Sequence, residues 1–495
     1  MSNHEWEPMN ENDFETMPGK SASGPPPDDA IEEAAPWRRS MSRVLIGMVL
    51  CAVTLNFWCL NYILPAIGMI LSLLGFRTLW HENKWFGGCF IITVIRTAYF
   101  LLVLVLNTTI IPSTILTSQV TSILNIASML LLLATSFCLW RGLRAAQRKV
   151  DLPVRAGGVA AMIICYALMC ILAVIRYNGL IIAVAIIIGY IVIVCYIYRL
   201  SKELDKAGYA IQTASIKATD KCIVIVLLSC LVIGSVFGYL FGGSYSMDWS
   251  QVESSEQTEV EEIKNRLIEL GFPENVLNDL APENIAACDG ALQVVVDITD
   301  EAVDDGRSVN NTEYKSPIEL RITGVGVQIP GEREKWIIFH HFLWSADPGF
   351  YGTESIQLWP VYQIVSEGWA SSGETSGRVM YDKDGETFAA PYYSLENKTY
   401  TSNKPYTLDS IFWGEQTSTD VFATFSMPKN GENYRGYIAY PILETQDGYT
   451  ISSWVNYTHQ RSRFQYPVMT AMEKRMSNSN NSAGAFITVW EELQF

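Results

Sequence analysis

The sequence predicts a chain of two parts: an α-helical multi-pass membrane domain, then a mainly antiparallel β domain of sandwich type, with a short helical lead-in between them. Three observations support this fold class. Apolar runs long enough to cross a bilayer are confined to residues 41–242, and short strand-like segments separated by tight turns fill residues 291–495. The third observation is that charge is segregated between these parts.

Acidic and basic residues are distributed unevenly along the chain. Residues 1–40 contain nine Asp/Glu and three Lys/Arg, residues 41–242 contain five and fifteen, and residues 243–495 contain thirty-seven and seventeen. This distribution is typical of a membrane domain flanked by solvated acidic segments, so we expect the lipid bilayer to be a partner. The large acidic region has no basic stretch, which argues against nucleic acid as a partner.

Residues 1–40 show no apolar periodicity and contain the run PPPDD, so we predict a disordered acidic tail. The first apolar run starts only near Val44, and we therefore expect an uncleaved membrane anchor rather than a signal peptide.

A membrane-spanning helix needs about twenty apolar residues, and this length divides the apolar region into seven predicted spans. They lie at about 44–60, 62–76, 85–106, 119–140, 157–175, 180–198 and 222–241. The first two form one long run, and we predict a tight hairpin whose turn lies near Asn61 and Pro65. The alternative is that residues 62–76 are re-entrant.

Basic loops predict the orientation, because short loops rich in Lys and Arg stay in the cytoplasm. Residues 141–155 and 199–221 each contain five Lys/Arg, whereas residues 107–118 contain none. Residues 243–495 are then extracytoplasmic. The hairpin places the bases before and after it, among them Arg43 and Arg77, on one side, so the N-terminal tail is predicted to be cytoplasmic.

The helical lead-in is predicted over residues 246–290. Val260, Ile263, Leu267 and Leu270 recur at helical spacing, and two short helices follow in FPENVLNDL and APENIAACDG.

The β domain, residues 291–495, is predicted from ten segments rich in β-branched and aromatic residues. They are LQVVVDI, IELRITGVGVQI, KWIIFHHFLW, SIQLWPVYQIV, GRVMYD, TFAAPYY, DVFATFSM, RGYIAYPIL, YTISSWVNY and AFITVW. DKDGE at 382–386 resembles the start of a calcium loop, but strands flank it on both sides and we predict a hairpin turn.

Arg96 lies midway along its predicted span, where a charged side chain is costly and usually functional. None of the seven spans contains Asp or Glu, so its partner must be a carbonyl, a lipid phosphate, an anionic ligand or a carboxylate of another protein. The next span and its lead-in carry a polar stripe with Thr117, Thr121 and Asn125, which we interpret as helix packing or the lining of a path. As a guess, Asn125 faces Arg96.

His340 and His341 are neighbours on one predicted strand and point to opposite faces, so they cannot bind one metal ion together. We expect one of them to be partly buried and the other exposed. No catalytic, nucleotide-binding or metal-binding motif is recognisable, so we predict no catalytic, cofactor or metal site. The domain is rich in tryptophan, which we expect to form mostly core and cross-strand pairs, the alternative being a sugar- or peptide-binding surface.

Nine of the ten cysteines lie in the apolar region, so residues 243–495 have only Cys288 and no internal disulfide. An extracytoplasmic domain without disulfides favours a bacterial cell membrane. The predicted function is a non-enzymatic membrane protein that displays an extracytoplasmic sensing or binding domain for a protein or ligand partner. The alternative is a transporter or export subunit in which Arg96 and the polar stripe line a path, and an extracytoplasmic hydrolase or transferase is a third hypothesis.

Overall fold

A computed structural model describes residues 36–52, 59–114, 118–155, 157–175, 179–209, 211, 219–252, 260–303, 318–363, 368–402, 416–462, 464–477 and 484–495. The chain forms two compact units. Unit 1 comprises Met1–Leu101 and Ser122–Leu227, and unit 2 comprises Leu102–Thr121 and Leu228–Phe495. The predicted acidic tail lies outside the described residues as far as residue 35, after which the chain is helical.

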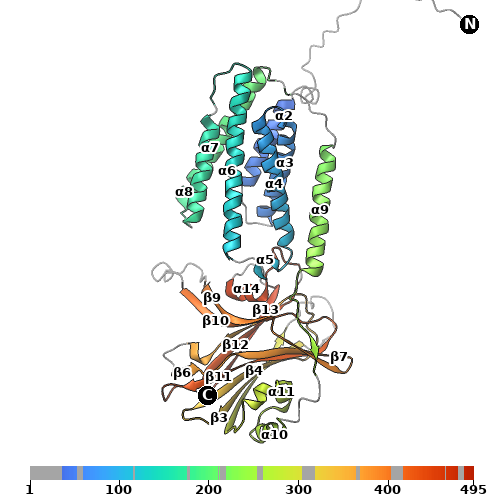
Figure 1. Ribbon diagram of the computed structural model, residues 1–495, viewed down its shortest axis with the longest axis vertical. Coiled ribbons are helices and arrows are strands. Elements are labelled where there is room, and N and C mark those ends of the chain that lie inside the picture. Colours follow the sequence, from blue (N-terminus) through green and yellow to red (C-terminus); the bar gives the residue numbers. More distant parts are fainter. Residues whose placement is uncertain are drawn as a thin grey trace, which may run out of the picture. The chain divides into compact units, whose positions relative to one another are not determined.

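Long apolar helices make up the N-terminal half of the described chain (Figure 1). They are α2 (Pro36–Ala52), α3 (Leu60–Leu79), α4 (Lys84–Leu106), α6 (Ser118–Lys149), α7 (Gly157–Val174), α8 (Leu180–Lys206) and α9 (Asp220–Phe241), with the single turn α5 (Ile111–Thr114) between α4 and α6. Five of them, α3, α4, α6, α8 and α9, are long and apolar enough to cross a membrane. The prediction of an apolar helical domain is confirmed to this extent, and the number of seven spans stays a prediction.

Helices α2 and α3 form an antiparallel hairpin whose backbones approach closely at glycines. A Cβ atom placed on Gly68 would lie 2.6 Å from the carbonyl oxygen of Gly47. The turn was predicted near Asn61 and Pro65, and this is wrong, because α3 runs unbroken from Leu60. Pro65 lies early in α3, where its missing N–H removes a single intrahelical hydrogen bond. Cys59, the residue before α3, has a left-handed φ of 59°.

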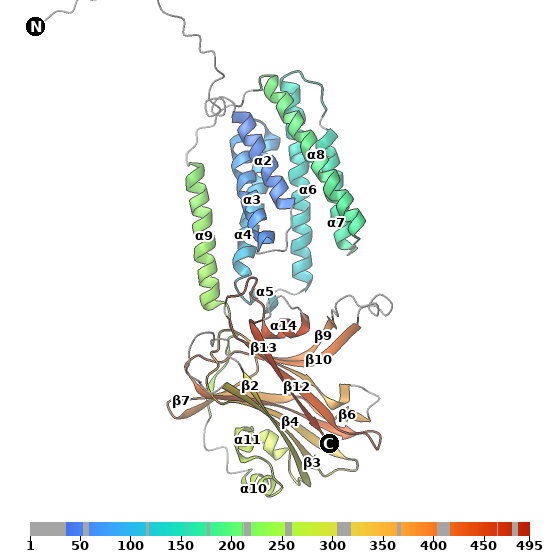
Figure 2. The ribbon, with the colours of Figure 1, turned by 180° about the vertical axis from the view of Figure 1, so that it is seen from behind.

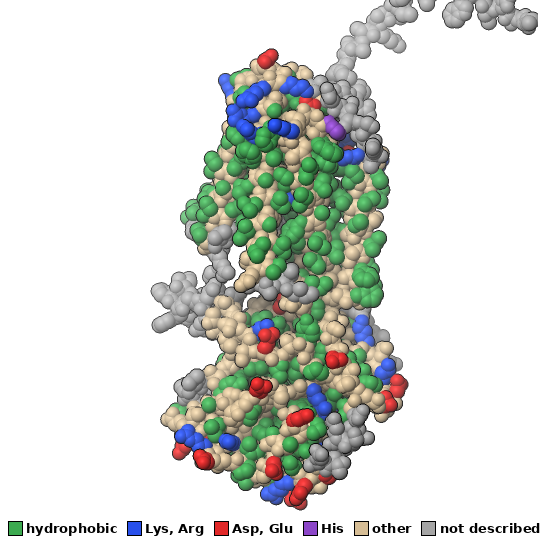
Figure 3. Space-filling model, in the orientation of Figure 1, with side chains coloured by type: hydrophobic (Ala, Val, Ile, Leu, Met, Phe, Trp, Pro, Cys, Tyr) green, Lys and Arg blue, Asp and Glu red, His purple; other side chains and the backbone are tan. Residues whose placement is uncertain are grey.

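Basic side chains gather at one end of the helices of unit 1 (Figure 3). Arg43 at the start of the hairpin and Arg77 at its end both bond Asp220 at the start of α9, at 2.8 and 3.2 Å. At the same end Lys149 pairs with Glu82, which also accepts a hydrogen bond from the Tyr209 hydroxyl at 2.8 Å. The start of α2, the end of α3, the end of α6 and the start of α9 therefore belong to one charged end of the unit.

The β domain consists of two antiparallel sheets. The larger has the order β1-β8-β7-β11-β4-β3-β2 with β6 beside β11, and the smaller has the order β13-β12-β5-β10-β9. The strands are β1 (Ser250–Gln251), β2 (Gln293–Val303), β3 (Ile318–Ile329), β4 (Lys335–Trp344), β5 (Glu354–Trp359), β6 (Trp369–Ser371), β7 (Ser376–Lys383), β8 (Glu386–Pro391), β9 (Ser394–Ser402), β10 (Gln416–Phe425), β11 (Glu432–Glu444), β12 (Ser452–Gln460) and β13 (Phe486–Gln494).

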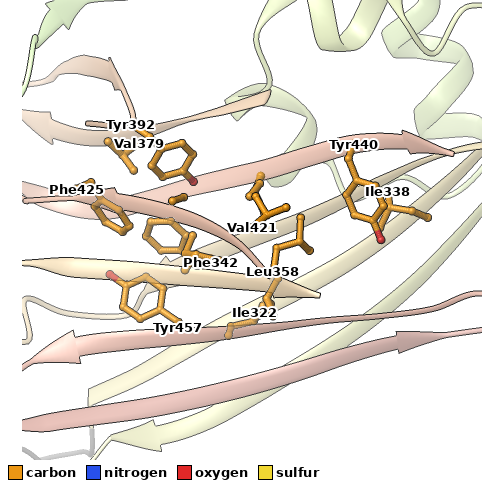
Figure 4. Packing of buried hydrophobic residues seen from close by; sticks show 14 of the residues in the cluster. Ile322, Ile338, Phe342, Leu358, Val379, Tyr392, Val421, Phe425, Tyr440 and Tyr457 are labelled. Atoms are coloured by element: carbon orange, nitrogen blue, oxygen red, sulfur yellow. The ribbon is translucent and has the colours of Figure 1, made fainter. Parts of the chain in front are cut away.

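One apolar core lies between the two sheets (Figure 4). Ile338 and Phe342 of β4 contribute from the larger sheet, and Leu358, Phe425 and Tyr457 contribute from the smaller one. Side chains alternate along each strand, so every second residue enters this core. The arrangement is a sandwich, as predicted.

Short helices cover the outer face of the larger sheet: α10 (Glu261–Glu269), α11 (Glu274–Asp279) and α12 (Pro282–Ala286), while α14 (Ala471–Ser477) contacts strands of the smaller sheet (Figure 2). Leu267, Val276 and Ile285 pack with Val325 and Phe339 of the sheet in a second buried cluster. The lead-in is helical as predicted, except that its beginning forms the short strand β1, which pairs with β8.

Each of the ten predicted segments contributes a strand, and the structure adds β1, β6 and the polar β9. The sequence DKDGE makes the β7–β8 hairpin as expected, with Asp384 and Gly385 at φ of 53° and 83°.

Candidate functional site

Arg96 lies in the middle of α4, twelve residues after Lys84 and ten before Leu106. At 1.5 Å per residue it is about 18 and 15 Å along the axis from the two helix ends. Its side chain is half-buried. It forms no hydrogen bond or ion pair with any residue in the described parts of the chain.

A small cavity lies beside Arg96. Its volume is about 30 Å³, measured as the space that the centre of a water molecule can occupy. Side chains of α2, α3, α4, α6 and α7 line it. Its polar members are Arg96, Ser72, Thr93, Thr135, Ser136 and Tyr166, and its apolar members include Met48, Phe76 and Leu132. All of these residues belong to unit 1.

Most hydroxyl protons around the cavity are already engaged. Thr135 and Ser136 donate to carbonyl oxygens one turn earlier in α6, at 2.8 and 3.0 Å. Tyr190 donates to the Met48 carbonyl at 3.0 Å, so its contact of 3.1 Å with Tyr166 requires the Tyr166 hydroxyl to be the donor.

Thr93 is one of two exceptions to this pattern. Its side chain is 1% exposed, and its hydroxyl has no hydrogen-bond partner in the described structure. Ser72, 7% exposed, likewise has no hydrogen bond to a described residue. The cavity therefore combines one cation with two hydroxyl groups that have protons to donate.

The structure places Arg96 beside Thr135 and Ser136 and leaves the predicted stripe elsewhere. Thr117 lies outside the described residues, and Thr121 and Asn125 are exposed on α6. Neither lines the cavity. Helices α4 and α6 run antiparallel, with Cys89 in the first part of α4 against Thr135 in the middle of α6.

Sequence reasoning missed five of the cavity's polar residues: Ser72, Thr93, Thr135, Ser136 and Tyr166. Thr93 precedes Arg96 by three residues and so shares its helix face, which is a signal that the sequence does contain. Ser72, Thr135 and Tyr166 come from three other helices, and only the packing brings them together.

All three histidines of the β domain are buried and paired with carboxylates. His340 and His341 point to opposite faces of β4 as predicted, but the expectation that one is exposed is wrong, because they are 2% and 1% exposed. Helix α11 covers the outer face and places Asp279 at 2.8 Å from His341 Nε2. His459 Nδ1 lies 2.9 Å from Glu354, whose burial raises the pKa of the carboxyl group above its ordinary value.

His340 lies between Ser453 and Glu491 in an arrangement that resembles a catalytic triad. Its Nε2 is 2.7 Å from Ser453 Oγ, and its Nδ1 is 2.7 Å from Glu491. A nucleophile must reach a substrate, however, and Ser453 is 0% exposed in the middle of the sandwich. The three residues therefore form a hydrogen-bonded polar cluster inside the core.

Asp279 is the centre of a second buried network. It accepts hydrogen bonds from His341 and from Arg435 Nε at 2.7 Å, and Arg435 also bonds Asp382 at 2.9 Å. Burial alone would raise the pKa of Asp279. The hydrogen bond and charge of His341, together with Arg435, outweigh burial and hold this pKa below its ordinary value.

Three of the six described tryptophans of the β domain, Trp336, Trp344 and Trp369, are buried. Trp454 and Trp490 are 38% and 57% exposed on neighbouring strands of the smaller sheet. Trp454 stacks on Trp359 at 4.8 Å with the ring planes 4° apart, a cross-strand pair of the expected kind. Among the described residues, no group of three His, Cys, Asp or Glu side chains is placed to hold a metal ion.

Comparison with known proteins gives no family. No family model and no curated protein matches the chain. One solved structure, described as "Pore forming protein", is 5% identical over 41% of this chain and 91% of its own, with a TM-score of 0.16. A likeness this low supports no conclusion about fold or function.

Proposed function

We propose that this chain is a non-enzymatic integral membrane protein of a bacterial cell membrane, whose β domain lies outside the cytoplasm and senses or binds a protein or ligand there. The observation that carries the proposal is the attachment of the β domain to two helix ends within unit 2. Tyr239 of α9 donates to the Gln465 carbonyl at 2.7 Å, and Tyr466 donates to the Leu104 carbonyl of α4 at 3.2 Å.

Further contacts make this attachment firm. The amide of Val468 donates to the Asn107 carbonyl at 2.7 Å. The segments that follow α4 and α9 are also joined to each other, because the amide of Ile110 donates to the Gly242 carbonyl at 2.8 Å. A domain that is merely displayed needs only a flexible tether. Several short hydrogen bonds give a route by which a change in the β domain reaches the end of α4.

The charged end of unit 1 supports the orientation. Arg43, Arg77 and Lys149 lie there with the start of α9, and an excess of Lys and Arg marks the cytoplasmic side. A single pass of α9 then leads away from the cytoplasm toward the β domain. Exposed Trp454 and Trp490 supply the kind of aromatic surface on which binding partners dock.

Cysteine labelling in whole cells tests the orientation, in a background where the exposed cysteines, Cys59, Cys195, Cys222 and Cys230, are replaced by Ser. We expect Glu386→Cys to react with a membrane-impermeant maleimide in intact cells, and Asn10→Cys and Arg148→Cys to react only after permeabilisation. Labelling of position 10 in intact cells would contradict the hairpin, and labelling of positions 148 and 386 from one side would contradict the proposed display.

Hydrogen exchange tests the coupling. The double variant Tyr239→Phe/Tyr466→Phe removes two donors without changing packing, and we expect faster amide exchange around Val468 in the full chain in lipid nanodiscs. Tyr449→Phe, at an exposed tyrosine, is the control. Equal exchange in both variants would refute a firm attachment.

The second candidate, a transporter or export subunit, is favoured by the polar cavity at Arg96. Replacing Arg96 by Leu should abolish the cellular function if the cavity lines a transport path, and should leave it intact if display and sensing are the role. Abundance of the variant in the membrane, measured in parallel, separates loss of function from loss of the protein.

A further inference from the structure

We propose that the cavity at Arg96 is a binding site for one small monovalent anion of the size of chloride or bromide. The inference depends on unit 1 alone and is independent of the role proposed for the β domain.

The charge of Arg96 needs a counter-ion. A guanidinium stays protonated in proteins, so it cannot become neutral as a buried lysine or histidine does. An unpaired charge in an apolar environment is strongly unfavourable. No carboxylate lines the cavity, and Arg96 forms no hydrogen bond with a described residue.

Lipid phosphate is too far away to serve as this counter-ion. Arg96 is about 18 and 15 Å along α4 from its two ends, and the hydrocarbon core of a bilayer is about 30 Å thick. The guanidinium therefore lies near mid-depth, beyond the reach of headgroups on either side. A carboxylate of another chain would have to enter a cavity that five helices line.

The size of the cavity selects the ligand. A water molecule needs about 10–15 Å³ on the same measure, so 30 Å³ accommodates two or three atoms of that size, fewer than the five heavy atoms of phosphate or sulfate. A halide ion fits this space, whereas phosphate and sulfate are too large. Met48, Phe76 and Leu132 form the apolar part of the wall, which suits an ion that loses its hydration shell easily.

The free donors agree with an anion and not with a cation. Thr93 has a buried hydroxyl without a partner, and Ser72 also has a proton to donate. Together with the N–H groups of Arg96 they provide donors from two helices. Carboxylates, the usual ligands of a metal cation, do not line the cavity.

Thermal unfolding of the full chain tests the proposal. The protein is reconstituted in nanodiscs of zwitterionic lipid, and sodium chloride or bromide replaces sodium gluconate at constant ionic strength. A ligand that binds the folded state raises the unfolding midpoint in a saturable way. We expect this rise with chloride and bromide and not with sulfate or phosphate.

Three variants define the site. Arg96→Gln should lose the halide response, whereas Arg155→Gln, the same substitution at an exposed arginine, should keep it. If Arg96→Gln does not fold, Thr93→Val provides the test, because losing one hydrogen bond to an ion should weaken halide affinity about tenfold.

The results that overturn the proposal are equally definite. A midpoint that is the same in chloride and gluconate means that the cavity holds water only. A halide response that survives Arg96→Gln, or an unchanged affinity in Thr93→Val, places the anion elsewhere. A response to phosphate in place of halide would exclude a site of this size.

Discussion

Removal of the Asp279 carboxylate should destabilise the β domain strongly. Asp279 is the last residue of α11, with 10% of its side chain exposed, and it accepts hydrogen bonds from His341 and Arg435 at 2.8 and 2.7 Å. In Asp279→Asn both partners stay buried while the charge that they face is lost. Breaking a buried pair from one side costs about 3–5 kcal/mol. Arg435 retains Asp382, so we expect the lower end, about 3 kcal/mol.

A surface pair of the same chemistry provides the control. Asp300 receives two hydrogen bonds from Arg321, at 2.7 and 3.0 Å, and both side chains are nearly half exposed. Asp300→Asn should therefore cost less than about 1 kcal/mol. Hydrogen exchange of the β4 amides, measured by mass spectrometry on the full chain in nanodiscs, gives the free energy of opening for each variant.

The pH dependence adds an independent check. The pKa of Asp279 in the folded protein lies below its ordinary value of 3.8. Its contribution to stability is then complete above the pKa of the unfolded chain and is lost as the pH falls through the lower folded pKa. The difference between wild type and Asp279→Asn should be constant near neutral pH and shrink below about pH 4. Equal costs for Asp279→Asn and Asp300→Asn would refute the reasoning.

Three further predictions follow from packing. Gly68→Ala should open the α2–α3 hairpin and reduce the folded fraction recovered on size-exclusion chromatography, because its Cβ would lie 2.6 Å from the Gly47 carbonyl oxygen. Gly189→Ala is the control and should fold normally, because no atom lies within 4 Å of its Cβ position. Equal folded fractions for the two variants would contradict this view of the hairpin. Phe425→Ala should lower the free energy of opening, measured by hydrogen exchange of the β10 amides, by about 3–5 kcal/mol, since the Phe425 side chain is 0% exposed and its ring centroid lies 5.5 Å from that of Tyr392. Trp454→Ala, at an exposed side chain, should lower it by about 1 kcal/mol. Burial raises the pKa of the Cys288 thiol to about 12, so this thiol should react with maleimide only when the domain opens. Its reaction should be far slower than that of the exposed thiol in Glu386→Cys, and similar rates would show that Cys288 is accessible.

The candidate site could be predicted only in part from the sequence. Arg96 stands out because it is the one charged residue within the predicted spans. Its surroundings do not stand out, because Thr135 and Ser136 look like any small polar residues of a membrane helix. The guess that Asn125 faces Arg96 used the regular stripe on α6 without knowing how α6 lies against α4. The Cys89–Thr135 contact sets this alignment, and no local pattern encodes it.

The β domain shows the same division. The turn at DKDGE was predictable because positive φ at Asp384 and Gly385 is a local requirement of a two-residue hairpin. The polar strand β9 was missed, since its sequence SLENKTYTS lacks the apolar alternation of a strand and its pairing with β10 comes from the tertiary fold.

Local sequence pattern was enough to predict the separation of an apolar helical part from a β part, the opposite faces of His340 and His341, and Arg96 as the one charged residue in the predicted spans. These follow from composition, from the two-residue period of a strand and from the cost of a charge among apolar side chains. The tertiary structure alone decided that α11 buries His341, that Ser453 is closed off from solvent, and that Thr93 and Ser72 face a cavity with Arg96. The physical reason is that burial and hydrogen-bond partners depend on which distant segments pack together, whereas the sequence pattern reports only on neighbours along the chain.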